Sequence, residues 1–170
     1  MLRLYGATGF ALVFALALCA NPLFAQSRPV LQPDVELIDN TGAFEFNGLD
    51  QSLDLGRSGA WNLSEGDFTI HVQVSFSSLI NDGPCYGPGC DMSIVDKMLY
   101  NNGDGWRLLK QSDNRFWFCL GGPGCDPASS TTVIGKTVAE TGLWYGVAAV
   151  KTSSQISIYV NGFEFSAHTA

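Results

Sequence analysis

The segment best suited to binding a ligand runs from Arg115 to Phe118 and reads Arg-Phe-Trp-Phe. Successive side chains of a strand point to opposite faces, so Phe116 and Phe118 share one face and have the character of core residues. On the other face, Trp117 offers an indole that can stack on a sugar ring. Arg115 or Lys110 would then bind hydroxyls or an acidic group. We predict Trp117, Arg115 and Lys110 as ligand-binding residues; the alternative is that both faces are covered and Trp117 is a second packing residue.

The acidic and histidine residues form no catalytic pattern. Glycoside hydrolases place two carboxyl groups about 5 to 9 Å apart, which on one strand face requires acidic residues at alternate positions. The acidic residues of the expected strands stand singly: Glu45, Asp54, Asp96 and Glu164. His71 and His168 are the only histidines, and no Gly-x-Ser-x-Gly turn accompanies them. We therefore predict that the protein has no catalytic site and that His71 is a surface histidine.

Cysteine usage favours disulfide bonds. Cys19 lies in the N-terminal apolar segment, and four cysteines follow it: Cys85, Cys90, Cys119 and Cys125. Each half of this set flanks a Gly/Pro turn, with four and five residues between the cysteines. A zinc site is the alternative, but the spacing differs from the two-residue spacing of zinc knuckles, and disulfides suit an exported protein better.

The elements that position these residues are strands. Phe68 to Phe76 alternates apolar and polar side chains without interruption, which is typical of a strand with one buried and one wet face. Further short alternating segments follow, separated by Gly, Asn, Asp and Pro turns, and Asn161-Gly162 is a strong hairpin signal. About eight to ten short strands without a convincing helix predict a β-sandwich or a barrel.

This arrangement also decides the disulfide pairing. If residues 92–98, 106–110 and 115–119 form an antiparallel meander, Cys90 and Cys119 lie at opposite edges of it. At about 3.3 Å per residue they are nearly 20 Å apart, whereas a disulfide needs Cα atoms within about 7 Å. We therefore predict the pairs Cys85–Cys90 and Cys119–Cys125.

Residues 1–25 have the layout of a secretory signal peptide. Arg3 precedes an apolar run from Phe10 to Ala20, and Pro22 and Ala25 prepare a cleavage point near Ala25. The run is shorter than the roughly 20 residues that span a bilayer, and the bulky Leu18 before Cys19 disfavours lipidation. The mature chain, secreted to an extracellular or periplasmic space, therefore has no membrane span.

The mature chain is acidic and long enough for one domain. Of 9 basic and 16 acidic residues, only Arg3 leaves with the signal, which gives a net charge of about −8. The basic residues are scattered, so nucleic acid and anionic membranes are poor partners. Residues 26–42 form a lead-in in which Pro29 and Pro33 discourage regular structure, and residues 43–170 form the domain.

Five segments in order resemble those of LamG-like (laminin G, concanavalin A-like) jelly-roll domains. They are 46–70 (Phe-Asn-Gly-Leu-Asp to Gly-Asp-Phe-Thr-Ile), 94–97 (Ile-Val-Asp-Lys), 105–108 (Gly-Trp-Arg-Leu), 143–150 (Leu-Trp-Tyr-Gly-Val-Ala-Ala-Val) and 156–162 (Ile-Ser-Ile-Tyr-Val-Asn-Gly). The resemblance implies an all-β fold, a two-sheet antiparallel jelly-roll β-sandwich, with Trp106 and Trp144 at core positions. Such domains carry further strands after the Asn-Gly hairpin, so the resemblance also implies that the last strands are missing and that open sheet edges invite association.

The resemblance allows calcium as a cofactor but defines no ligand set. Relatives hold calcium at the sandwich rim with carboxylate and carbonyl oxygens, and here Asn47 replaces the usual Asp of one turn. The candidate carboxylates all lie in loops: Asp50, Asp67, Asp82, Asp91, Asp104 and Asp126. Most of them are explained equally well as turn residues.

These observations together predict a secreted, non-catalytic recognition module that binds glycans. The alternative is a protein-interaction or adhesion module of an extracellular or cell-surface assembly. An enzyme related to the glycoside hydrolases of this fold is the least favoured interpretation, because the paired carboxylates are absent.

Overall fold

The computed structural model describes residues 3–5, 10–13, 30–31, 37–38, 43–46, 51–56, 63, 66–79, 92–97, 105–121, 125–126 and 131–169. Within these ranges, side chains are described only between residues 43 and 163. The described residues form strands and turns and contain no α-helix. In particular, none of them belongs to a helix long and apolar enough to cross a membrane.

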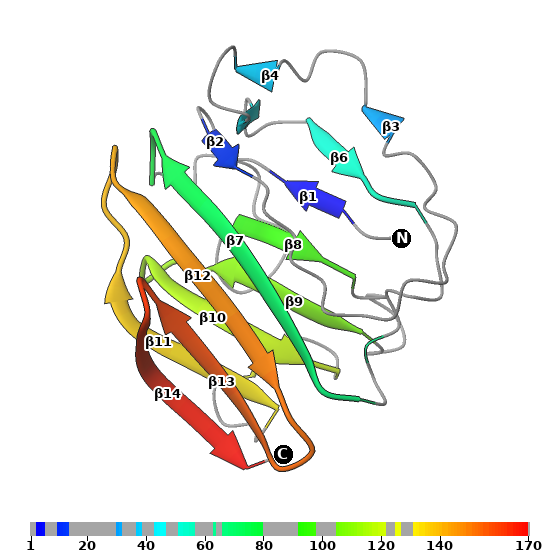
Figure 1. Ribbon diagram of the computed structural model, residues 1–170. Helices are drawn as coiled ribbons and strands as arrows, with labels where there is room; N and C mark the ends of the chain where they lie inside the picture. Colours follow the sequence, from blue (N-terminus) through cyan, green and yellow to red (C-terminus); the bar gives the residue numbers. More distant parts are fainter. Residues whose placement is uncertain are drawn as a thin grey trace.

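The strands form two sheets, in which every pair of neighbours is antiparallel (Figure 1). The first sheet has the order β11 (Thr132–Val138), β10 (Arg115–Leu120), β9 (Trp106–Lys110), β8 (Met92–Asp96), β1 (Arg3–Tyr5), β6 (Ser52–Asp54) and β3 (Val30–Leu31). The second sheet has the order β14 (Phe163–Thr169), β13 (Gln155–Val160), β12 (Trp144–Lys151), β7 (Phe68–Phe76), β2 (Phe10–Val13), β5 (Ala43–Phe46) and β4 (Leu37–Ile38). The predicted all-β fold with two antiparallel sheets is confirmed.

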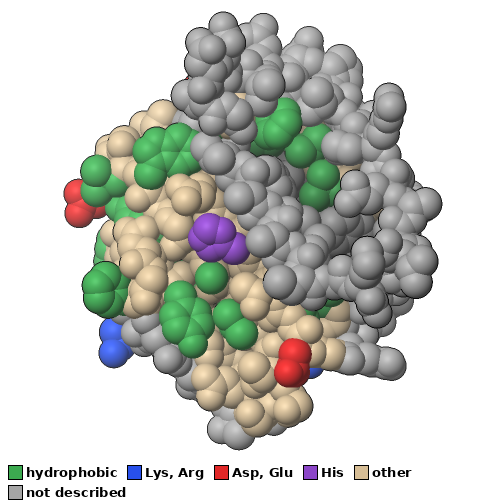
Figure 2. Space-filling model, in the orientation of Figure 1, with side chains coloured by type: hydrophobic (Ala, Val, Ile, Leu, Met, Phe, Trp, Pro, Cys, Tyr) green, Lys and Arg blue, Asp and Glu red, His purple; other side chains and the backbone are tan. Residues whose placement is uncertain are grey.

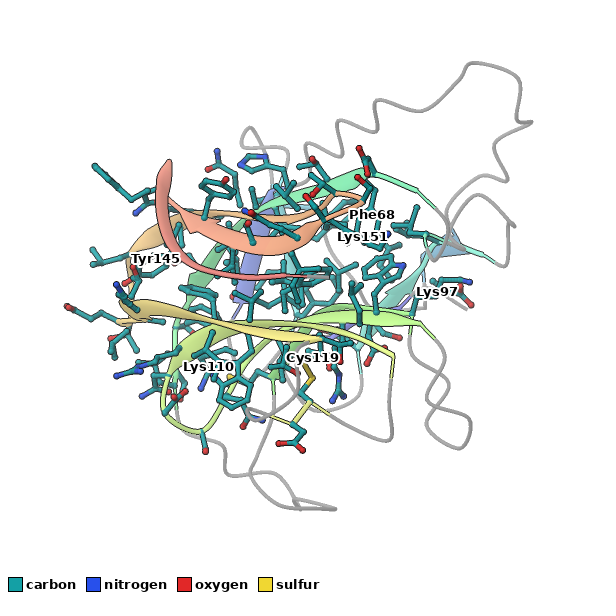
Figure 3. The ribbon with its side chains drawn as sticks, turned by 90° about the horizontal axis from the view of Figure 1, so that it is seen from below. Phe68, Lys97, Lys110, Cys119, Tyr145 and Lys151 are labelled. Atoms are coloured by element: carbon teal, nitrogen blue, oxygen red, sulfur yellow. A yellow bond between two sulfur atoms is a disulfide. The ribbon has the colours of Figure 1, made fainter. Side chains whose placement is uncertain are left out.

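The two sheets pack face to face, and the core lies between them (Figure 3). The alternation of β7 has the expected consequence: Ile70, Val72, Val74 and Phe76 are buried in this core. Tyr145 of β12 packs against Phe116 of the opposite sheet, with ring centroids 5.3 Å apart. Burial of one face of each sheet is therefore what joins the two layers.

The antiparallel meander on which the disulfide prediction depends is present. β8 pairs with β9, and β9 pairs with β10, all antiparallel. The turn between β9 and β10 contains Asn114 at φ 60°, a left-handed conformation that asparagine tolerates better than most residues. The hairpin predicted at Asn161-Gly162 is also formed, with φ values of 53° and 82° at these two positions.

The N-terminal segments hold inner positions in both sheets. β1 lies between β6 and β8 in the first sheet, and β2 lies between β5 and β7 in the second. Both strands belong to the segment that the sequence predicts as a cleaved signal. The lead-in of residues 26–42 also contributes, through the two-residue strands β3 and β4 at the sheet edges.

Candidate functional site

Trp117 lies on the outer face of the first sheet, as predicted, but its side chain is covered. It is only 9% exposed and packs with Leu109 and Cys119, with Ile134 and Cys125 against them. Within the described part of the chain, its Nε1 atom has no hydrogen-bond partner. An indole that is nine-tenths buried offers a sugar ring little area for stacking, so this geometry suits a packing residue better than an open platform.

Lys110 lies on the opposite face of this sheet from Trp117. It stands directly across from the core residue Phe116 in the β9–β10 ladder and is 0% exposed. Its Nζ atom donates a hydrogen bond of 2.7 Å to Oδ1 of Asn114 and one of 3.3 Å to the carbonyl oxygen of Gln111. The ammonium group of Lys110 therefore stabilises the turn between β9 and β10.

Arg115 is exposed at the start of β10. Its Nε atom lies 3.9 Å from a carboxylate oxygen of Asp113, and both side chains are largely open to solvent. The pairing of β10 with β11 shifts register between Arg115 and Trp117. The structure therefore does not bring Arg115, Trp117 and Lys110 together on one open surface, and their role in binding stays a prediction.

The cysteine prediction is confirmed where the structure describes it. Cys119 and Cys125 form a disulfide, with an S–S distance of 2.06 Å and Cα atoms 5.5 Å apart. The bond joins the end of β10 to the following loop, on the side of the first sheet that faces away from the second (Figure 3). Cys85 and Cys90 lie outside the described residues.

The outer face of the second sheet carries aromatic and polar side chains together, and Gln73, Trp144 and Asn161 are exposed on it. Strands β7, β12 and β13 lie side by side here, and their outward positions are the alternate ones that do not enter the core. We call the following set the His71 surface: His71, Gln73, Trp144, Gly146, Ala148, Tyr159 and Asn161. Figure 2 shows this face, with histidine near its middle and hydrophobic side chains around it.

The middle strand of the His71 surface is lined by its smallest residues. Gly146 stands opposite Gln73, and Ala148 stands between His71 on one neighbouring strand and Tyr159 on the other. Adjacent strands are about 4.8 Å apart, so the two flanking rows of larger side chains are roughly 10 Å apart across β12. The surface therefore combines a narrow strip of small residues with aromatic and polar groups on both sides of it.

Gly146 is the point at which polar atoms converge on this strip. A Cβ atom added to Gly146 would lie 3.5 Å from Nε2 of His71 and 3.8 Å from Oδ1 of Asn161, both ordinary contact distances. The Asn161 side chain is held there, because its Oδ1 accepts a hydrogen bond of 2.9 Å from the Gly146 backbone N–H. The Asn161 N–H in turn donates to the Gly146 carbonyl oxygen at 2.7 Å. Because Gly146 has no side chain, Nε2 of His71 and Oδ1 of Asn161 both border the space that a side chain would occupy here.

Trp144 lies at one end of the strip and is 44% exposed. The resemblance placed it at a core position, together with Trp106, but only Trp106 is in the core. The reason is strand phase: Tyr145, Val147 and Ala149 are the inward residues of β12, so Trp144 points outward. The two-residue period of a strand, applied to the sequence of 144–150, indicates that Trp144 and Tyr145 face opposite sides of the sheet.

Two of the carboxylates that the structure describes, those of Asp96 and Asp54, act in local structure. Asp96 is paired with Arg107, with Nε and Oδ2 2.8 Å apart, and Asp54 accepts the N–H of Gly56 at 2.8 Å. The described residues contain no group of three His, Cys, Asp or Glu side chains that could hold a metal ion. Asp50, Asp82, Asp91 and Asp104 lie outside them, so calcium binding stays an expectation.

Comparison with known proteins adds no family to this description. No family model, no curated protein and no solved structure matches the chain. The two antiparallel sheets are compatible with the LamG-like resemblance, which stays a prediction.

Proposed function

We propose that the protein is a secreted, non-catalytic recognition module that binds glycans on the His71 surface. The single observation that carries the proposal is the exposure of Trp144 at the end of a strip of small residues. Glycan recognition combines an apolar ring face with a few well-placed hydrogen-bonding groups, and the surface offers both kinds of contact. Export after cleavage near Ala25 is part of this proposal, and the Cys119–Cys125 disulfide fits an oxidising compartment.

The polar groups of this surface are suited to sugar hydroxyls. An imidazole nitrogen of His71 and the amide groups of Gln73 and Asn161 can donate or accept hydrogen bonds, as a hydroxyl also can. The backbone of each belongs to a paired strand or to the hairpin after β13, so little ordering is required when a ligand binds. A preordered sheet surface of this kind suits an extended polysaccharide better than a small ligand that needs enclosure.

A second candidate, a protein-interaction module, is favoured by a different observation. Among the described side chains, four large hydrophobic residues are strongly exposed: Val138, Leu143, Trp144 and Phe163. All four lie where β11 ends or where β12 and β14 begin, at one end of the sandwich. Exposed apolar side chains gathered in this way are typical of protein contact sites.

The test is a glycan array read with and without a chelator, using the wild-type chain and two matched glycine variants. Gly146→Leu places a side chain between His71 and Asn161, at a backbone conformation that ordinary residues adopt. Gly66→Leu is the control, since nothing lies within 4 Å of its added Cβ. Gly66 lies just before β7, roughly 20 Å from Gln73 along the strand.

We expect binding that Gly146→Leu abolishes and Gly66→Leu preserves. Loss of the wild-type signal with the chelator would assign calcium a role in it. No binding to any glycan, with both variants folded, would contradict the proposal and favour the protein-interaction module. Hydrolysis of a bound polysaccharide by the purified chain would contradict the non-catalytic assignment.

A further inference from the structure

Strand β2 occupies an inner position that the exported chain cannot fill with the same residues. β2 pairs antiparallel with β5 on one side and with β7 on the other. Its residues, Phe10–Val13, lie within the apolar run predicted to leave with the signal peptide. Before cleavage, the second sheet therefore has a strand at this position, and after cleavage near Ala25 it has a gap.

The gap has the dimensions of a single strand. Neighbouring strands in a sheet are about 4.8 Å apart, so β5 and β7 are roughly 10 Å apart with β2 between them. Removal of β2 leaves backbone N–H and C=O groups unpaired on the facing edges of both strands. An edge of this kind is a template for another strand, and here two edges face the same slot.

The register defines what would fill the slot. Phe46 of β5 and Phe76 of β7 stand opposite Phe10, and Val74 of β7 stands opposite Leu12. Phe46, Val74 and Phe76 are each 0% exposed, so the slot borders the core. An incoming strand therefore needs apolar residues at alternate positions, and it must run antiparallel to both neighbours.

We propose that the slot between β5 and β7 is a strand-acceptor site of the exported protein. Its occupant is an extended segment of another polypeptide, apolar at alternate positions. The other sheet supports the same interpretation, because β1 (Arg3–Tyr5) lies between β6 and β8 and leaves with the same cleavage. Strand addition of this kind gives affinity through backbone hydrogen bonds and specificity through alternate side chains. The proposal depends on export and is independent of glycan binding.

The test uses the full chain with a protease site inserted between Ala25 and Gln26. Hydrogen exchange is measured at the β7 amides of residues 73–76, before cleavage and after the cleaved leader has been removed. A synthetic peptide of residues 7–16 is then added in trans. The controls are a peptide of scrambled order and a peptide carrying Leu12→Pro, which lacks one backbone N–H.

Within residues 73–76, the amides that face β2 alternate with those that face β12. We expect exchange at the amides facing β2 to rise at least tenfold when the leader is removed, and the peptide of residues 7–16 to restore their protection. The scrambled and proline peptides should not restore it. If leader removal unfolds the whole chain, refolding by the matching peptide alone supports the proposal. Unchanged exchange after leader removal, or equal restoration by the scrambled peptide, would overturn it. Cleavage is confirmed separately by mass, so incomplete cleavage is distinguishable from a failure of strand acceptance.

Discussion

Replacing Trp144 with alanine tests the glycan proposal at the residue that carries it. Trp144 is 44% exposed, and its place in β12 is maintained by backbone pairing with Ser75. The substitution therefore removes the aromatic surface offered to a ligand while leaving the strand ladder in place. The same substitution at Trp117 removes a side chain that is 9% exposed, so it alters packing as well as any binding.

The expected loss of affinity follows from the area that a ligand could cover. A tryptophan side chain buries about 150–250 Å² when fully covered, so the exposed 44% of Trp144 corresponds to about 65–110 Å². At about 25 cal/mol per Å², complete coverage is worth about 1.6–2.8 kcal/mol. A sugar ring that covers half of this area contributes about 0.8–1.4 kcal/mol, which is a loss of about four- to tenfold in Kd.

The assay is isothermal titration calorimetry with the best oligosaccharide from the array. Phe163→Ala is the matched control, since Phe163 is an aromatic residue that is 69% exposed and pairs with the core residue Val160, outside the His71 surface. Thermal unfolding of both variants establishes that they are folded. A Trp144→Ala variant that binds within twofold of wild type would refute the reasoning. Equal losses in Trp144→Ala and Phe163→Ala would also refute it, and would favour the apolar end of the sandwich as the contact site.

Three further predictions concern stability, measured by urea or thermal unfolding. Asn114→Ala should destabilise the fold by about 2–4 kcal/mol, because it removes a hydrogen bond to the buried Lys110 ammonium and forces alanine into a left-handed conformation. Asn114→Gly should cost about 1–2 kcal/mol less, because glycine adopts that conformation without strain. Equal costs for the two variants would contradict this account. Trp117→Phe should cost less than about 1.5 kcal/mol, because it also removes a buried N–H without a described partner. Trp117→Ala should cost about 3–5 kcal/mol, because it leaves a cavity. Similar costs for the two variants would argue that the outer face of the first sheet is not packed. The double variant Cys119→Ala/Cys125→Ala should lose about 2–3 kcal/mol, since the bond closes a short loop, and unchanged stability on reduction would show that the bond does not form in solution.

The inner side of the fold could be predicted from sequence because alternation reports it directly. Phe68–Phe76 alternates without interruption, and its apolar phase is the core phase in the structure. The hairpin at Asn161-Gly162 was predictable for a similar reason, since both residues tolerate a positive φ. The Cys119–Cys125 pair followed from the spacing of strands in a meander.

The outer side of the fold could not be predicted in the same way. Trp117 and Trp144 both lie on outer faces, but only Trp117 is covered, and alternation within one strand does not say what packs against its outer face. The sequence predicts that Lys110 binds a ligand together with Trp117, and it does not show that the β9–β10 register sets Lys110 opposite the core residue Phe116. That register is set by the turn at Asn114, and alternation within a single strand does not reveal how two strands are paired.

The most direct test of the glycan proposal is a titration of the isotope-labelled chain with an oligosaccharide, followed by amide chemical shifts. The Gly146 and Asn161 amides are suitable reporters, because each donates to an oxygen of the other residue. The proposal predicts that both amides, and the indole N–H of Trp144, shift progressively and saturate with a single Kd. Saturable shifts confined to Trp117, Arg115 and their neighbours, with Gly146 and Asn161 unchanged, would contradict it.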